Sequence, residues 1–324
     1  MLSSNEWSPL KEVIVGRADY ARIPKVDLTL RTVNYADVDD VIDIPSGQYP
    51  KKVIEEANQD LEIFADFLKE IGVKVHRPKF FTIPEYYNYC PRDSVLILEN
   101  HIIETPMPLK ARANENINLL HILANFRANH FKFTPERHIA SYNEKCIGNP
   151  EELALTDIEP LFDAANILRD GKNLYYLVSN SGNMKGAIEL QRMLPNYHVW
   201  PIEGVYSYMH LDSTIALLDK GKMLLNPDRI KSIKQLPKPL QDWEPIWCPE
   251  PVDIGYYKNY CNASKWINMN LFSVHPKLVV LEEHQEPLAE ELAKHGIESK
   301  LLPMRHQRTL GGGFHCVTLD LLRK

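Results

Sequence analysis

The sequence predicts an α/β protein in which ββαβ-type units repeat around one central site. Four times along the chain, two apolar runs flank a short turn sequence, as in β-hairpins. Three apolar patterns of helical spacing end at Gly or Pro and continue into another strand-like run. No linker separates these units, so we expect residues 1–324 to form a single domain. A two-domain open α/β sheet is the alternative, and the hairpins argue against its parallel strand order.

The individual elements follow from turn and stop residues. The predicted hairpins turn at Glu99-Asn100, Asp170-Gly171, Lys220-Gly221 and His275-Pro276. The predicted helices cover Leu61–Gly72, Met184–Leu194 and Glu286–Gly296. Strands are expected directly after these helices, because apolar residues resume within three positions of each stop.

Composition restricts the class of partner. The 324 residues are 44% hydrophobic and 25% charged, which is typical of a soluble globular protein. The net charge of -6 argues against nucleic acid and anionic membranes, both of which favour a basic face. No apolar run approaches the roughly 18 residues of a membrane helix.

The chain ends and cysteines predict a cytoplasmic location. Residues 1–9 lack the basic and apolar regions of a signal peptide, and no transit peptide is expected. The five cysteines are odd in number and scattered, without a C-x-x-C pair. This pattern fits a reducing cytosol and argues against a structural zinc site.

The stretch Gly311-Gly312-Gly313 before Cys316 is the strongest local sign of chemistry. Three residues without a Cβ let another backbone or a small molecule approach closely. Cys316 is then expected at the edge of a strand, where His315 would point to the opposite face. A glycine turn before a buried structural cysteine explains the local residues equally well. A reactive thiol also needs a base or cation from elsewhere in the chain.

Polar residues at the ends of the predicted hairpins offer such partners. His210 and Asp212 would share one face of an extended segment, although a core histidine satisfied by an acid is the simpler reading. Asp93 and Asp163 each precede a predicted hairpin, where turn or capping roles are usual. Arg229 is ordinarily interpreted as a solvated surface residue, and Ser264 as a helix cap. Paired carboxylates together suit a planar guanidinium.

These residues belong to ordered motifs that resemble a known family. The motifs are Asn5–Ala18, Pro91–Asp93, Phe162–Ala165, Met209–Asp212, Asn226–Arg229, Ser264–Trp266 and Gly311–Cys316. In them the chain resembles the arginine-dependent amidinotransferases. These comprise the glycine amidinotransferases of creatine synthesis and their relatives in aminocyclitol antibiotic and cyanobacterial toxin pathways. The resemblance implies the pentein fold, a five-fold pseudo-symmetric α/β propeller.

The resemblance also implies a role for each residue. Cys316 is expected to attack the guanidino carbon of arginine, His210 to protonate the departing ornithine amine, and Asp163 to orient His210. Asp93 and Asp212 correspond to the carboxylates that grip the guanidinium. Arg229 and Ser264 correspond to groups that hold the amino-acid end, and Met209 and Ser207 belong to the loop at the entrance. The expected cycle is ping-pong through an amidino-cysteine, without a metal or an organic cofactor.

Departures from the family pattern leave the acceptor open. Ala263 replaces a serine, Ser207 and Tyr208 replace Asn and Pro, and Asn166 replaces an acid. Glycine is the default acceptor, and a lysine-like or natural-product amine the alternative. Two other readings are an arginine deiminase-like hydrolase and a pentein that only binds a partner. A homodimer is expected by analogy with the family.

Overall fold

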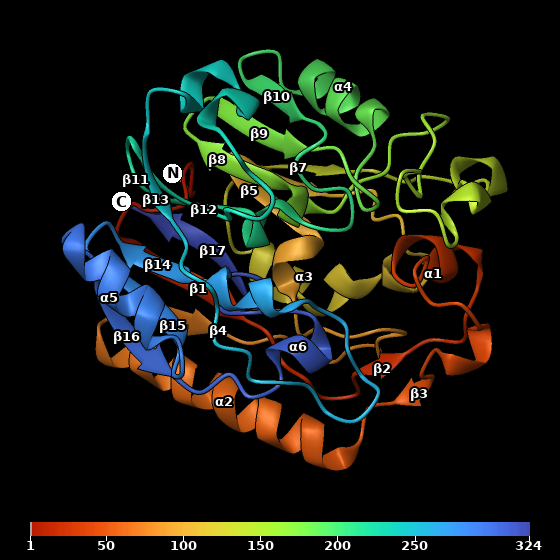
Figure 1. Cartoon of the computed structure of the whole chain (residues 1–324), viewed down its shortest axis with the longest axis horizontal. Coiled ribbons are helices and arrows are strands. Elements are labelled where there is room, and N and C mark those ends of the chain that lie inside the picture. Colours follow the sequence, from red (N-terminus) through yellow and green to blue (C-terminus); the bar gives the residue numbers. More distant parts are fainter. Residues whose placement is uncertain (1) are drawn as a thin grey trace.

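Five three-stranded sheets with one shared strand pattern make up the protein. In this computed structural model, which describes residues 2–324, each sheet pairs two antiparallel strands and then adds a third strand parallel to the middle one (Figure 1). In chain order, the strands that form these sheets are β1 (Leu10–Val15), β4 (Lys74–His76) and β17 (Thr318–Arg323); β5 (Val95–Leu98), β6 (His101–Glu104) and β7 (Asn129–Lys132); β8 (Ile167–Asp170), β9 (Asn173–Leu177) and β10 (His198–Ile202); β11 (Ile215–Asp219), β12 (Lys222–Leu225) and β13 (Glu244–Trp247); and β14 (Phe272–His275), β15 (Leu278–Glu282) and β16 (Glu298–Leu302). A separate two-stranded sheet consists of β2 (Arg22–Ile23) and β3 (Gly47–Gln48).

The four predicted hairpins are confirmed as β5/β6, β8/β9, β11/β12 and β14/β15. Gly171 and Gly221 have φ angles of 59° and 80° at two of the turns, a region that glycine enters without steric cost. The fifth antiparallel pair joins the two ends of the chain, since β17 lies beside β1.

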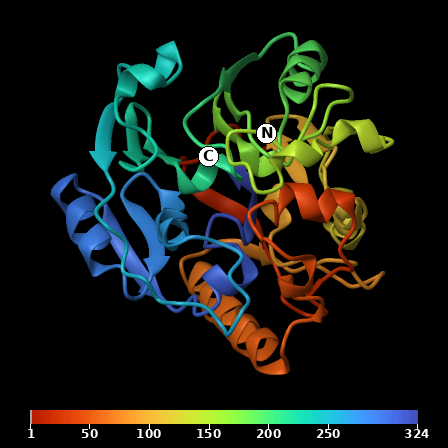
Figure 2. The ribbon, with the colours of Figure 1, turned by 45° about the vertical axis from the view of Figure 1, so that its right-hand side comes forward.

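In four of the five sheets an α-helix lies between the middle strand and the strand parallel to it. The helices are α1 (Leu28–Val33), α2 (Lys51–Glu70), α3 (Leu120–Leu123), α4 (Met184–Met193), α5 (Glu286–Lys294) and α6 (Gln307–Leu310). Those that lie between such strands are α2, α3, α4 and α5. Helices α2, α4 and α5 pack on β4, β10 and β16 and lie on the outside of the molecule (Figures 1 and 2). Helix α2 begins ten residues before the predicted Leu61, because Val53 and Ala57 extend its buried face at helical spacing.

A buried cluster of ion pairs ties the chain ends to the sheets. Asp320 of β17 accepts from Arg169 of β8 at 2.8 Å, and Arg92 lies 2.7 Å from the same carboxylate. Glu6 accepts from Arg169 at 2.7 Å. Every member is almost fully buried, so each charge depends on its partners. Within residues 2–324, none of the helices combines the length and apolar content that crossing a membrane requires.

Candidate active site

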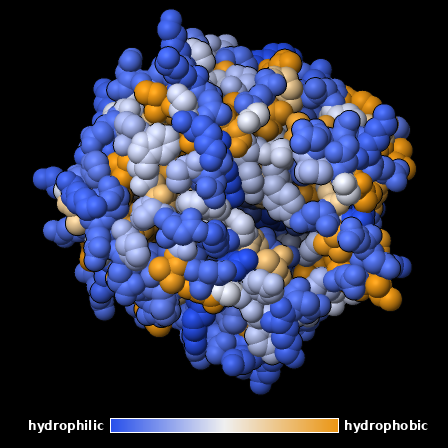
Figure 3. Space-filling view, in the orientation of Figure 1, coloured by the Kyte–Doolittle hydropathy of each residue, from blue (hydrophilic) through white to orange (hydrophobic). Residues whose placement is uncertain are grey.

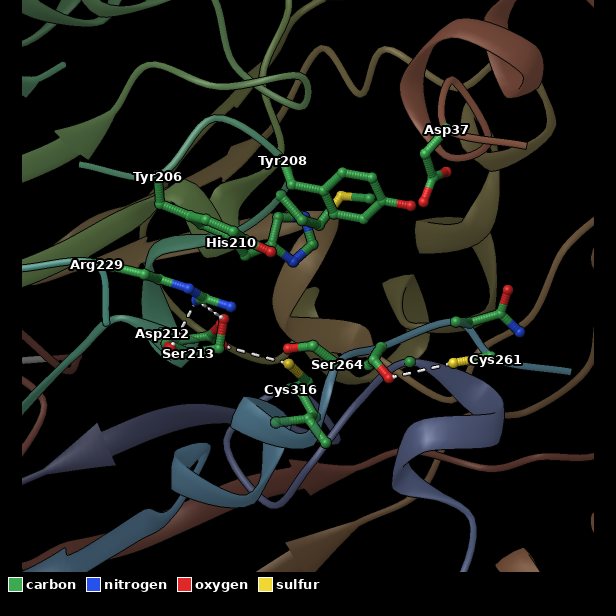
Figure 4. Close-up of a pocket in the computed structure, with 15 residues that line it drawn as sticks. Asp37, Tyr206, Tyr208, His210, Asp212, Ser213, Arg229, Cys261, Ser264 and Cys316 are labelled. Carbon is green, nitrogen blue, oxygen red and sulfur yellow. Dashed lines mark hydrogen bonds between the residues drawn. The ribbon is translucent and has the colours of Figure 1, made fainter. Parts of the chain in front are cut away.

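A cavity of about 410 Å³ collects most of the predicted site residues. Cys316, His210, Asp212, Arg229, Ser264 and Met209 all line it (Figure 4). The space-filling view shows the surface hollowed near the centre of one face, with mainly hydrophilic residues around the hollow (Figure 3). Ser207 is exposed and does not line the cavity, so the structure does not bring this predicted contact to the site.

The site residues converge because they occupy the same place in successive units. A short 3₁₀ turn precedes the first strand of four sheets: Pro91–Asp93, Ala164–Asn166, Leu211–Ser213 and Lys265–Met269. These turns pack against one another in sequence order around the site. Asp93 ends the first turn, and Asp163, His210 and Ser264 are the residues immediately before the other three.

Cys316 lies in a turn, not in the strand predicted for it. Residues 314–317 form this turn, and β17 begins only at Thr318. Asn270 holds the turn, because its side-chain oxygen accepts from the backbone nitrogens of His315 at 3.1 Å and Cys316 at 3.0 Å. The expectation that His315 and Cys316 face apart is therefore wrong: both side chains contact the same oxygen of Asp212, at 2.8 and 3.3 Å.

Asp212 is held as a carboxylate by this arrangement. Burial alone would raise its pKa, but the hydrogen bond and charge of His315, followed by the charge of His210, lower the pKa to about 2. Leu211–Ser213 form a 3₁₀ turn, so the expected extended geometry was wrong although both His210 and Asp212 reach the cavity. Asp212 is thus an anion beside the sulfur of Cys316.

His210 is placed between two carboxylates. Its Nε2 lies 2.9 Å from Asp163 Oδ2, and its Nδ1 lies 3.7 Å from Asp93 Oδ1. Burial lowers the pKa of His210, but the charge of Asp93 and the hydrogen bond with Asp163 outweigh burial and raise the pKa well above its ordinary value. The imidazole is therefore held as a cation that can donate a proton.

Asp93 and Asp163 are not the capping residues that their positions suggested. Asp163 makes no side-chain capping hydrogen bond, and Asp93 instead accepts from Arg112 at 2.8 Å. Burial raises the pKa of Asp93, although His210 and Arg112 oppose that shift. One oxygen of each carboxylate, Oδ1, is buried without a hydrogen-bond partner among the described residues. Buried acceptors of this kind are costly unless a ligand supplies the donors.

The sulfur of Cys316 also contacts a second thiol. Contact with Cys90, then burial and the charge of Asp212, raise the pKa of Cys316 well above its ordinary value. The hydrogen bond with His210 opposes this rise. The resting Cys316 side chain is thus a neutral thiol, and a nearby cation would favour its ionisation. Sequence reasoning missed both Cys90 and Arg112, although Cys90 directly precedes the Pro91–Asp93 motif.

Arg229 and Ser264 both line the cavity, although their sequence context suggested a solvated surface arginine and a capping serine. Arg229 is half-buried, donates to Ser213 Oγ at 2.9 Å and Thr214 Oγ1 at 2.7 Å, and stacks 3.5 Å above the ring of Tyr206. Its three hydrogen bonds within residues 2–324 all use one guanidinium nitrogen, so the other donors of Arg229 have no partner among these residues. Ser264 forms no capping hydrogen bond, so its hydroxyl remains available to a ligand.

No protein-family model matches the chain. It is 41% identical over 334 residues to inosamine-phosphate amidinotransferase 1 of Streptomyces glaucescens, covering 98% of this chain and 95% of the relative. The chain belongs to the amidinotransferase family. It is also 31% identical to the L-arginine:L-lysine amidinotransferase of Pseudomonas savastanoi pv. phaseolicola, over 99% of this chain and 94% of that one.

Solved structures agree with this amidinotransferase assignment. The inosamine-phosphate amidinotransferase of Streptomyces griseus superposes with a TM-score of 0.95 at 40% identity, covering 100% of this chain and 97% of that one. A dimethylarginine dimethylaminohydrolase of Pseudomonas aeruginosa, at 15% identity and a TM-score of 0.62, covers 98% of this chain and 100% of its own and shares the α/β fold alone. The predicted family and enzyme class are confirmed.

Proposed function

We propose that this amidinotransferase takes the amidino group from L-arginine, carries it on Cys316 and passes it to an acceptor amine, with ornithine as the first product. The observation that carries the proposal is the convergence of the Cys316 thiol, the His210 imidazolium and the Asp212 carboxylate at a single cavity. Asp93 and Asp163, each with one unsatisfied oxygen, lie on either side of that imidazolium. A guanidinium would supply the donors that these oxygens lack, because His210 lies 3.7 Å from Asp93 Oδ1 and contacts Oδ2, not Oδ1, of Asp163.

The donor would bind with its guanidinium between Asp93 and Asp212. Asp93 Oδ1 and the carboxylate of Asp212 offer acceptors that match the planar fork of a guanidinium. The free donors of Arg229 and the hydroxyl of Ser264 would hold the carboxylate end of arginine, and Met209 would contact its aliphatic part. Binding of arginine would then also activate Cys316, because the guanidinium is a cation that lowers the pKa of the nearby thiol.

The first half-reaction forms a carbon–sulfur bond and breaks a carbon–nitrogen bond. The thiolate of Cys316 attacks the guanidino carbon, and His210 gives its proton to the nitrogen that leaves as ornithine. The proton of the thiol replaces the one that His210 has lost, so that overall one proton moves from sulfur to the ornithine amine. The product is an amidino-cysteine.

The second half-reaction reverses these steps with another amine. The acceptor attacks the amidino carbon, the departing Cys316 sulfur takes the proton of the His210 imidazolium, and His210 takes the proton of the acceptor nitrogen in its place. Acting as acid and then as base suits a group whose charge is set by neighbouring carboxylates. Glycine is the default acceptor, with a lysine-like or natural-product amine as the alternative; the relatives are named for inosamine phosphate and lysine.

We further propose one pentein domain over residues 1–324, with the five sheets as blades of a five-fold propeller. The repeated strand pattern and the matching positions of the site residues support this arrangement. A cytoplasmic location is proposed because all five cysteines are free. The homodimer rests on the family resemblance.

Product analysis tests the proposed reaction. The protein is incubated with L-arginine alone, with arginine and glycine, and with arginine and lysine, and ornithine and citrulline are measured. We expect sustained ornithine release only when an amine is added, and none from Cys316→Ser. Sustained citrulline release without an amine would instead identify a guanidine hydrolase and contradict the proposal.

A further inference from the structure

One side of the cavity is not used by the proposed arginine donor. Asp37 lies in the segment after α1 and lines the cavity together with Tyr208. Figure 4 shows the Asp37 carboxylate beside the Tyr208 ring and on the opposite side of the cavity from Arg229. The α-amino and α-carboxyl groups of an arginine held at Arg229 are joined to one carbon, so the same end of the donor does not reach Asp37.

The Asp37 carboxylate is an uncompensated negative charge. It is exposed, and among residues 2–324 no hydrogen bond or ion pair reaches it. No lysine lines the cavity, and its single arginine, Arg229, is fixed by Ser213 and by stacking on Tyr206. Burial, and after it the charge of Asp37, raise the pKa of Tyr208, which agrees with the place of both residues in the cavity lining.

The Tyr208 side chain is fixed over the same region. Its hydroxyl donates to the backbone oxygen of Asn34 at 2.6 Å, and this bond joins the entrance loop to the segment that carries Asp37. The ring therefore forms an apolar part of the cavity wall that ends beside the Asp37 carboxylate (Figure 4). Tyr208 stands where the resemblance to the glycine amidinotransferases implies a proline, so this wall differs from theirs.

We propose that Asp37 selects an acceptor that carries a second ammonium group, such as an aliphatic diamine. This inference rests on the proposed amidino transfer and specifies its acceptor. One amine of the acceptor attacks the amidino carbon on Cys316, the methylene chain lies along the Tyr208 ring, and the second ammonium pairs with Asp37. An acceptor whose far end is a carboxylate or a phosphate is repelled at the same place.

The test uses three acceptors of equal chain length and different end charge: 1,4-diaminobutane, 1-aminobutane and 4-aminobutyrate. Amidino-enzyme is prepared with L-arginine, freed of ornithine, and mixed with each amine while the loss of the adduct is followed by mass spectrometry. We expect 1,4-diaminobutane to discharge the adduct at least fivefold faster than 1-aminobutane, as an exposed charge pair permits, and 4-aminobutyrate to be slowest. The diamine preference should weaken as salt is added.

Two variants test whether Asp37 causes the preference for the diamine over the monoamine. Asp37→Asn should reduce the ratio of diamine to monoamine rates by at least fivefold, whereas Asp39→Asn, an exposed neighbour outside the cavity lining, should leave the ratio unchanged. Faster discharge by 4-aminobutyrate would show that Arg229 selects the acceptor and would overturn the inference. An unchanged ratio in Asp37→Asn, or a slower release of ornithine from arginine in that variant, would overturn it as well.

Failure of this inference is distinct from failure of the proposed function. If wild-type protein forms no adduct with arginine, the amidino transfer itself is wrong. If the adduct forms and amines discharge it without a dependence on Asp37, only the assignment of the acceptor is wrong.

Discussion

Replacing Asp163 with asparagine tests the role assigned to the imidazole of His210. The substitution keeps the size of the side chain but removes the charge that lies 2.9 Å from His210 Nε2. Because Asp163 helps to raise the pKa of His210, the variant should have a lower pKa at this histidine. In the proposed mechanism the imidazolium of His210 is the proton donor to ornithine, so this donor should be lost at lower pH in the variant than in the wild type.

The size of the effect follows from what remains around His210. A positioned acid or base contributes about 10²–10⁴ in rate. Asp93 stays 3.7 Å from Nδ1, so one of the two carboxylates still supports the cation. We therefore expect a loss at the lower end of this range, about 10²-fold, which corresponds to roughly 2.7 kcal/mol in the activation barrier.

The assay is the burst of ornithine after rapid mixing with L-arginine in the absence of an acceptor, measured across pH. Asp66→Asn, which removes a carboxylate from the exposed face of α2, is the matched control and should behave as the wild type. A burst rate within threefold of the wild type, with its high-pH limb unmoved, would refute the assignment of His210 as the acid supported by Asp163.

Three other substitutions test features around the sulfur and the central ion pairs. Cys90→Ala should lower the pKa of Cys316, because contact with Cys90 is the first cause of its rise, and peptide mapping after iodoacetamide should show faster alkylation of Cys316 at neutral pH; slower alkylation would contradict this. Gly312→Ala places a Cβ 2.5 Å from the Cys90 sulfur and 3.1 Å from the Cys316 Cβ. Overpacking of this kind costs roughly 1–3 kcal/mol in the free energy of unfolding. The rate of ornithine formation should fall by more than this loss of stability explains. Arg169→Met leaves Asp320 without one of its partners and should cost about 3–5 kcal/mol in urea unfolding at neutral pH; a loss under 1 kcal/mol would show that the remaining cations suffice.

Local sequence was sufficient for the four hairpins and for the C-terminal ends of α2, α4 and α5, which lie within two residues of the predicted ends. The turn residues Asp170-Gly171 and Lys220-Gly221 determine their own conformation, so neighbouring strands could be paired without knowledge of the rest of the chain. The strands predicted after the three helices are confirmed as β4, β10 and β16. Their parallel pairing was not predictable in this way, because a helix separates each of them from its partner strand. The β1–β17 pair was missed entirely, since it joins residues from opposite ends of the chain.

The site residues could be predicted only where they belong to the ordered motifs that resemble the family. The family resemblance gave Cys316, His210 and the three aspartates their roles, whereas the local context of Asp93 and Asp163 indicated caps that the structure does not contain. Arg112 could not be predicted, because its sequence context resembles a solvated surface and only tertiary packing brings it to Asp93.

Mass spectrometry of the intact protein and its peptides after arginine treatment tests the central claim most directly. The account predicts a mass increase of one amidino group, located on the peptide that contains Cys316 and lost when an acceptor amine is added. An unmodified Cys316 while ornithine is still produced, or an adduct on Cys90 instead, would contradict the proposed nucleophile.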